Sequence, residues 1–174
     1  MKYYTGVGSR DTPDFVCKLM TITAKYLDSK GYKLRSGGAR GADYSFEIGA
    51  ESPDIYSVSK KHISISKKPS IIPDLEAYRQ IASLCCLHYK RITNQHAKDL
   101  HTRNICQVIG HIPDQVIKSD FLLAYTDKGD YVGGTTTAIR CAERFDVPVF
   151  NFGKYKTEEE MKDNLKEFLK QHMR

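Results

Sequence analysis

The stretch Ser36-Gly37-Gly38-Ala39-Arg40-Gly41-Ala42-Asp43 turns an apolar strand into a helix through nearly bare backbone. Glycines let main-chain N–H groups approach an anion without a Cβ in the way, and a helix that begins near Ala42 directs the positive end of its dipole to the same place. Two further stretches repeat this pattern: Gly6-Val7-Gly8-Ser9-Arg10 after the first strand and Gly133-Gly134-Thr135-Thr136-Thr137 before a late helix. Together the three turns predict a phosphate-binding site.

Strand and helix patterns alternate along the chain. Apolar runs predict strands at residues 2–7, 32–35, 54–58, 120–125 and 147–150, and amphipathic patterns predict helices at residues 13–30, 43–50, 73–89, 102–109, 135–144 and 157–172. This alternation predicts an α/β fold, a doubly wound and mainly parallel sheet with helices on both faces. Ligands of such sheets bind at the carboxyl ends of the strands, where all three turns fall. Residues 59–70 fit either an exposed loop or an edge strand.

Composition restricts the class of protein. With 174 residues, 40% of them hydrophobic and 28% charged, residues 1–174 fit one domain with a real core. The net charge of +6 suits a phosphorylated or polyanionic partner. Five cysteines without a CxxC spacing argue against a disulfide framework or a zinc site and favour a reducing compartment. No apolar run approaches the roughly 20 residues of a membrane span. We therefore expect a soluble cytoplasmic protein with no membrane partner.

Polar side chains beside the first two turns are candidate ligand groups. Ser9 and Arg10 offer a hydroxyl and a guanidinium suited to a phosphate or carboxylate, although Arg10 has the alternative of pairing with a nearby aspartate. Asp43 and Glu47 lie four residues apart, so their carboxylates share a helical face. They could bind ribose hydroxyls or act as an acid–base pair. Alternatively, Asp43 caps the helix and Glu47 is solvated or paired with Arg40.

Other candidates lie later in the chain. The threonines at positions 135, 136 and 137 offer one N-cap and two further hydroxyls. Arg103, at the start of a predicted helix, could close over a phosphate while Asn104 reads a base edge or a ribose; the alternative is a surface arginine and a capping asparagine. The spacings of His88, His96 and His101 fit a shared metal site poorly, so we expect no metal and no cofactor.

The glycine motifs, in their order and spacing, resemble the SLOG superfamily of Rossmann-like proteins. This superfamily includes the DNA-processing protein A (DprA/Smf) family and the lonely-guy (LOG) phosphoribohydrolases. The segments that carry the resemblance are Gly6–Arg10, Leu34–Asp43, Gly133–Arg140 and Val147–Asn151. The likeness is greatest to small stand-alone DprA-like proteins of bacteriophages, to which Arg103–Gly110 and Asp120–Thr126 are also similar. A phage protein would work in the host cytoplasm.

The resemblance implies a ligand site and an assembly. Its ligand-binding residues would be Gly6, Gly8, Ser9, Arg10, Ser36, Gly37, Gly38, Ala39, Arg40, Asp43, Arg103, Asn104, Gly133, Gly134, Thr135, Thr136 and Thr137. It also implies a homodimer or higher homo-oligomer. The sequence departs from both better-known groups, because Arg140 stands where LOG enzymes carry a catalytic glutamate, and the residues after Phe152 have room for one helix and not for a winged-helix domain.

Three functions remain open from the sequence. The favoured one is binding of a phosphorylated nucleoside or ADP-ribose-like nucleotide, as in capture or sensing of a nucleotide signal, because it needs only the three turns. The second is a hydrolase or transferase acting at a nucleotide N-glycosidic or phosphoribosyl linkage through Asp43 or Glu47 as catalytic residues. The third is DprA-like binding of single-stranded DNA through the lysines at positions 60, 61, 67 and 68, although few aromatic residues accompany them.

Overall fold

A six-stranded parallel sheet forms the centre of the molecule in the computed structural model, which describes residues 1–61 and 65–173. The strands lie in the order β4-β3-β2-β1-β5-β6. Their bounds are β1 Lys2–Gly8, β2 Tyr32–Ser36, β3 Asp54–Tyr56, β4 Ser70–Ile71, β5 Phe121–Tyr125 and β6 Val149–Asn151. Every strand pair is parallel. The predicted α/β class with a parallel, doubly wound, Rossmann-like sheet is confirmed.

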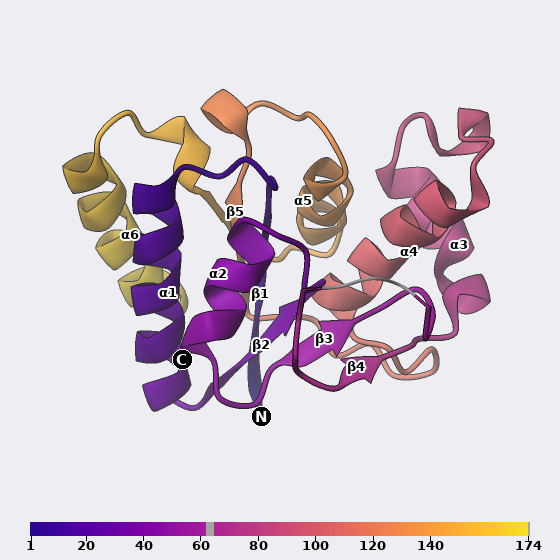
Figure 1. The fold of residues 1–174 in the computed structure, drawn as a ribbon, viewed down its shortest axis with the longest axis horizontal. Coiled ribbons are helices and arrows are strands. Elements are labelled where there is room, and N and C mark those ends of the chain that lie inside the picture. The colour runs from indigo at the N-terminus through magenta and orange to yellow at the C-terminus, as the bar shows by residue number, and fades with distance from the viewer. Residues whose placement is uncertain (62–64, 174) are drawn as a thin grey trace.

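Helices cover both faces of this sheet (Figure 1). Their bounds are α1 Asp14–Ser29, α2 Ala42–Gly49, α3 Leu75–Cys85, α4 Gln95–Ile109, α5 Thr135–Arg144 and α6 Glu158–His172. One buried cluster joins α1, α2 and α6 to the sheet through residues such as Phe46, Phe121 and Leu165. A second joins α3, α4 and α5 to the other face through residues such as Ile105 and Ile139. Two hydrophobic layers therefore hold the sheet between them.

The chain changes direction between β1 and β5. From β1 it winds outward through β2 and β3 to β4, and then returns across α3 and α4 to β5 on the other side of β1. β1 is thus flanked by β2 and β5, and the loops that follow β1 and β5 diverge from adjacent strand ends. Such a switch point leaves a crevice at the carboxyl edge of the sheet.

Two helices and one strand differ from the sequence expectation, the strand being the one expected at residues 54–58, which ends at Tyr56. The helix expected at residues 102–109 begins at Gln95, because the Asn94 side chain caps it by accepting a hydrogen bond from the Ala97 N–H at 2.9 Å. The helix expected at residues 73–89 ends at Cys85 and is followed by a short 3-10 turn, η1 at Tyr89–Arg91. In the segment 59–70, residues Ser70–Ile71 form the edge strand β4, while residues 62–64 lie outside the described residues.

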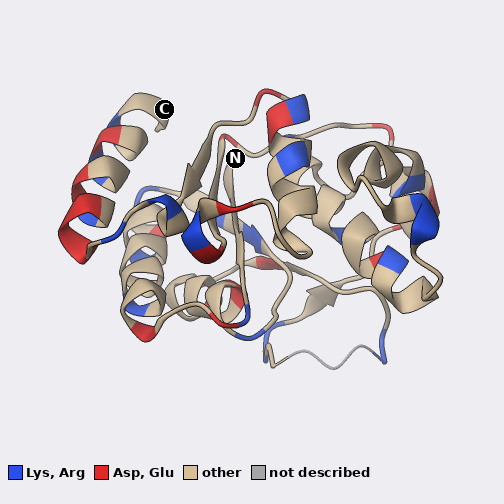
Figure 2. Ribbon diagram, turned by 90° about the horizontal axis from the view of Figure 1, so that it is seen from above, with Lys and Arg blue, Asp and Glu red and all other residues tan. Residues whose placement is uncertain are grey.

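Charge and cysteines follow the sequence analysis more closely. Figure 2 shows that the lysine and arginine positions are distributed along helices of both layers, and not along a single stripe. All five cysteines are unpaired. Among the residues that the structure describes, no helix has the length and apolarity to cross a membrane.

Candidate functional site

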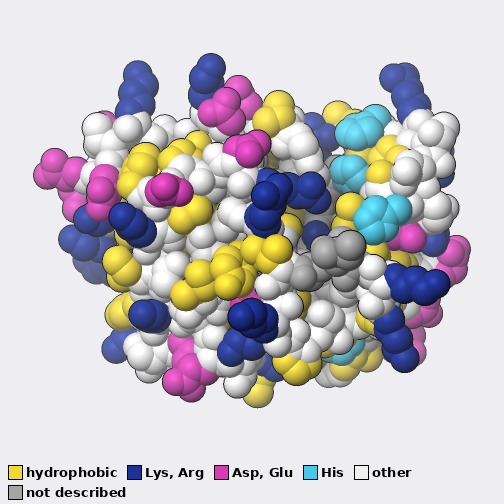
Figure 3. Space-filling view, in the orientation of Figure 1, with side chains coloured by type: hydrophobic (Ala, Val, Ile, Leu, Met, Phe, Trp, Pro, Cys, Tyr) yellow, Lys and Arg dark blue, Asp and Glu magenta, His cyan; other side chains and the backbone are white. Residues whose placement is uncertain are grey.

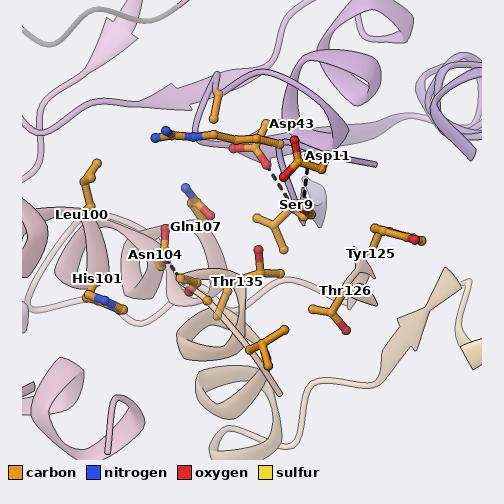
Figure 4. Close-up of a pocket in the computed structure, with 18 of the residues that line it drawn as sticks. Ser9, Asp11, Asp43, Leu100, His101, Asn104, Gln107, Tyr125, Thr126 and Thr135 are labelled. Atoms are coloured by element: carbon orange, nitrogen blue, oxygen red, sulfur yellow. Dashed lines mark hydrogen bonds between the residues drawn. The ribbon is translucent and has the colours of Figure 1, made fainter. Parts of the chain in front are cut away.

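A pocket of about 480 Å³ opens at the switch point, at the carboxyl ends of β1 and β5 (Figure 4). Its walls come from the loop after β1, the turn before α2, the inner face of α4, the loop after β5 and the start of α5. Its polar lining residues are Ser9, Arg10, Asp11, Asp43, His101, Arg103, Asn104, Gln107, Thr126, Asp127 and Thr135. This volume lies within the usual range for small-ligand sites, roughly 300–1,000 Å³.

In the first glycine turn, most of the backbone groups are hydrogen-bonded or packed against other parts of the protein. A Cβ on Gly8 would lie 2.6 Å from the Ala42 Cβ, so the glycine permits α2 to pack on β1. The Gly8 N–H donates to Asp43 Oδ1 at 3.1 Å, and the Ser9 N–H donates to the Tyr125 carbonyl at 3.0 Å. A Cβ on Gly6 would meet the Phe46 ring at 2.7 Å. Gly6 therefore serves packing, whereas Gly8, Ser9 and Arg10 line the pocket.

The second turn is likewise filled from inside the protein. Ser36 Oγ donates to the Gly6 carbonyl at 2.7 Å, and the Ala42 N–H donates to the Ser9 carbonyl at 3.2 Å. Gly41 has a φ of +80°, and a Cβ there would lie 2.4 Å from the Ser9 carbonyl oxygen. Of the residues predicted in this turn, Ala39 and Asp43 line the pocket, while Ser36, Gly37, Gly38 and the exposed Arg40 do not.

A buried pair of opposite charges explains why this turn is closed. Asp43 is 4% exposed and Arg103 is 7% exposed. A Cβ on Gly37 would lie 2.6 Å from the Arg103 guanidinium carbon, and Arg103 Nη1 donates to the Gly37 carbonyl at 3.1 Å. The guanidinium therefore occupies the space that the glycine leaves. With its amide oxygen directed at this turn, Gln107 accepts from the Gly37 N–H at 3.3 Å.

The environment of the two charges shifts both pKa values. Burial raises the pKa of Asp43 to about 6, against the opposing effects of the Arg103 charge and of backbone hydrogen bonds from Ala39, Gly8 and Gly37. Burial lowers the pKa of Arg103, and the nearby Asp43 carboxylate opposes that shift. Because each charge stabilises the other in a desolvated position, the two side chains form one electrostatic unit in the wall of the pocket.

The third turn differs from the other two. A Cβ on Gly133 would meet nothing within 4 Å, and one on Gly134 would meet only Asn104 Nδ2, at 3.8 Å. Asn104 Nδ2 donates to the Gly134 carbonyl at 2.9 Å and so fixes the turn. Within the described part of the chain, no backbone carbonyl accepts from the N–H groups of Gly134, Thr135 or Thr136. These amides lie at the positive end of the α5 dipole, an arrangement that favours a negatively charged group.

The threonines of this turn have separate roles. Gly134 is the N-cap of α5, so none of the three threonines caps the helix. Thr136 Oγ1 donates to the Val132 carbonyl at 3.0 Å, and Thr137 Oγ1 is 2.7 Å from His101 Nδ1. Thr135 is the threonine that lines the pocket. The expected pair of additional hydroxyls is thus reduced to one.

Arg103 and Asn104 lie in the middle of α4 and are buried, which rules out the alternative of a surface arginine and a capping asparagine. The Glu47 carboxylate lies one turn farther along α2 than that of Asp43, about 6 Å along the axis. It accepts a hydrogen bond from Ser66 Oγ at 2.7 Å and does not line the pocket. The structure therefore does not bring Asp43 and Glu47 together as an acid–base pair around a ligand.

Several pocket residues were missed from the sequence. His101 and Gln107 lie on the same face of α4 as Arg103 and Asn104, and Asp127 follows β5. Thr126 is held by Asn151, whose Nδ2 donates to Thr126 Oγ1 at 2.7 Å. The pKa of His101 is lowered mainly by burial and to a smaller extent by the nearby His88. The spacing of residues 100, 101, 104 and 107 places them on one face of a helix and could have identified them together. That inference would have required knowing that α4 begins at Gln95 and not at residue 102.

No protein-family model and no curated protein matches the chain. Among solved structures, the chain is similar to DNA processing protein A from Helicobacter pylori, in a study of its single-stranded DNA binding mode. The TM-score is 0.60 at 16% identity, and the match covers 98% of this chain and 81% of that chain. At this identity the likeness establishes the fold. Of the two groups that the glycine motifs resemble, DprA and LOG, the similar structure belongs to the DprA group.

Proposed function

We propose that the chain binds single-stranded DNA, with one backbone phosphate held at the start of α5. The observation that carries this proposal is that the N–H groups of Gly134, Thr135 and Thr136, at the start of α5, have no backbone acceptor among the described residues; Gly134 and Thr135 line the pocket. Backbone amides at a helix N-terminus bind phosphate through direct hydrogen bonds and through the helix dipole. The DprA-like fold supports DNA as the source of that phosphate, since the similar protein binds single-stranded DNA.

The edges of the pocket favour a polymer. Gly133, Gly134 and Arg10 line the pocket and are exposed, so a strand could enter and leave without being enclosed. Tyr125 lines the pocket, and Tyr131, which is 48% exposed, lies two residues before the third turn. Base stacking on such aromatic rings, together with a positive groove, is typical of proteins that bind single strands.

A free nucleotide, the function that the sequence favoured, is the second candidate. The observation that supports it is the pocket itself, whose 480 Å³ suits one nucleotide and whose polar side chains converge from several elements. Asn104 and Gln107 could hydrogen-bond a base or ribose there. The two candidates share the phosphate site and differ in whether neighbouring nucleotides contribute to binding.

Fluorescence anisotropy with a labelled oligothymidylate tests the proposal, with unlabelled dTMP, ATP, NAD and ADP-ribose as competitors. We expect the oligonucleotide to bind and its affinity to fall steeply with salt, because phosphate contacts release counterions. Arg10→Ala should weaken binding and reduce the salt slope by about 1, whereas Arg40→Ala, an exposed arginine outside the pocket lining, is the matched control. Binding of a mononucleotide without affinity for the oligonucleotide would contradict DNA binding and favour the second candidate.

A further inference from the structure

Three metal-ligand side chains converge where α3, η1 and α4 meet, beside the pocket. Cys86 directly follows α3, His88 directly precedes η1, and His101 lies on α4. Each offers one ligand atom, and these atoms all lie within 4.8 Å of one another. Cys86 Sγ is 3.8 Å from His88 Nε2, and the His88 and His101 ring centroids are 5.6 Å apart at an interplanar angle of 89°. Figure 3 shows histidine side chains gathered on this side of the molecule, over α3 and α4.

We propose that Cys86, His88 and His101 bind a divalent, thiophilic metal ion, with Zn²⁺ as the best fit. One thiolate and two imidazoles form a soft donor set that suits Zn²⁺ and excludes Mg²⁺ and Ca²⁺, which require oxygen ligands. In a tetrahedral zinc site, bonds of about 2.0–2.3 Å place neighbouring ligand atoms about 3.5 Å apart. The observed separations, which reach at most 4.8 Å, therefore require a closure of up to about 1.3 Å. His88, which is exposed and lies on a short connection, can provide most of it.

The surroundings of the cluster resemble a prepared site. His101 Nδ1 is hydrogen-bonded to Thr137 Oγ1 at 2.7 Å, which leaves Nε2 of the same ring for the metal. A second hydrogen bond of this kind is the usual way in which a metal-binding histidine is oriented. The neighbouring Cys85 lies near Cys141 of α5, whereas the Cys86 sulfur lies within 4.8 Å of a ring nitrogen of each histidine. Cys86 is thus distinguished from Cys85 as the ligand thiol.

The spacing of the histidines along the sequence does not reveal this cluster, because one of its three ligands is a cysteine. The missing ligand was Cys86, which the end of α3 brings to His88. Binding would convert the Cys86 thiol into a metal-bound thiolate and release one proton to solvent, while the two neutral imidazoles bind without losing a proton. Three protein ligands leave a fourth position for water. The inference does not depend on the proposed DNA binding.

Metal titration of the purified full chain, first treated with a chelator, tests the inference. Co²⁺ serves as a spectroscopic probe through its thiolate charge-transfer band, and Zn²⁺ affinity is measured by competition with a chromophoric chelator. We expect one ion per chain, loss of the charge-transfer band in Cys86→Ser, and at least about tenfold weaker Zn²⁺ binding in His88→Gln and in His101→Gln.

His96→Gln, on the exposed side of α4, and Cys17→Ser, on α1, are the matched controls and should leave binding unchanged. His88→Gln alters an exposed side chain, so its effect can be read even if Cys86→Ser folds poorly. The inference would be overturned if the wild-type protein bound no Zn²⁺ at micromolar concentrations, or if all the ligand variants bound the ion as tightly as the controls.

Discussion

The turn before α2 and the turn before α5 are both rich in glycine and both lie at the carboxyl edge of the sheet. The first is filled by protein atoms, whereas the second is open to the pocket. In the first, the guanidinium of Arg103 lies against Gly37 and the Ala42 N–H is already bonded to Ser9. In the second, the space around Gly133 is open and the first amides of α5 have no backbone acceptor among the described residues. Glycine-rich turns therefore serve internal packing as readily as ligand binding.

The largest expected effect comes from removing the charge that fills the first turn. Arg103→Met leaves the Asp43 carboxylate buried without its opposite charge, and we expect a loss of about 3–5 kcal/mol in the free energy of unfolding. Urea denaturation measures it. The double variant Asp43→Asn/Arg103→Met should recover part of the loss, because both charges are then absent. Equal stability of the single and double variants would show that the two side chains are not coupled.

A methyl group added to each turn compares them directly. Gly41→Ala forces a residue with a Cβ into a φ of +80° and against a backbone carbonyl, so we expect a loss of about 2–4 kcal/mol in unfolding free energy. Gly134→Ala, at an ordinary helical φ of −66°, should change stability by no more than about 0.5 kcal/mol. Thermal and urea unfolding of both variants provide the measurement. Similar losses in the two would contradict the distinction between a filled and an open turn.

The pKa of Asp43 makes the filled turn sensitive to pH. The folded-state pKa of about 6 exceeds the ordinary value of 3.8, so the folded protein binds the proton more tightly than the unfolded chain does. Stability should therefore fall as pH rises from about 4 to about 6, by an amount on the order of 3 kcal/mol, and this contribution should stay constant above that window. Urea unfolding at several pH values, with Asp43→Asn as reference, measures it. Parallel profiles for the two proteins would contradict the shift.

The same methyl group tests the open turn as a binding site. The Gly134→Ala side chain would lie where a phosphate approaches the α5 amides, and we expect oligothymidylate affinity to fall about tenfold. Anisotropy titration measures it, and the unchanged stability of the variant serves as the internal control. An affinity equal to that of the wild type would place the phosphate elsewhere.

A smaller effect concerns the expected homo-oligomer. Ile22, Tyr26 and Ile48 are 63%, 47% and 55% exposed, and Gly49 packs against the α1 backbone at Thr21, so these side chains lie on adjacent helices. We expect a second copy to cover this apolar surface. Light scattering should show that Ile48→Lys weakens the affinity of the dimer at least about tenfold. Leu87→Lys, which replaces an exposed side chain in the connection after α3, is the control. A monomeric wild type would contradict it.

The fold class could be predicted from the sequence because hydrophobic periodicity and glycine turns depend on local structure. The helix expected at residues 135–144 matches α5, and the parallel sheet follows from the alternation of elements. Two boundaries were missed for local reasons. Asn94 caps α4 well before the apolar positions begin, and α3 ends at Cys85 because the chain there turns to η1.

The site could be predicted only in part, because which turn is filled depends on long-range contacts. Arg103 is 66 residues from Gly37 along the chain, and no local pattern shows that its guanidinium lies there. The same holds for Cys86 and His101, which meet only after α3 and α4 pack together. Sequence patterns located the turns at the pocket, whereas tertiary packing determined their roles.

The most direct test of the open turn as the anion site is amide chemical-shift mapping of the ¹⁵N-labelled protein during titration with oligothymidylate. The amides of Gly134, Thr135 and Thr136 should shift most and saturate together, while those of Gly37 and Gly41 should move little. Large shifts at Gly37 and Gly41 with an unchanged third turn would contradict the account.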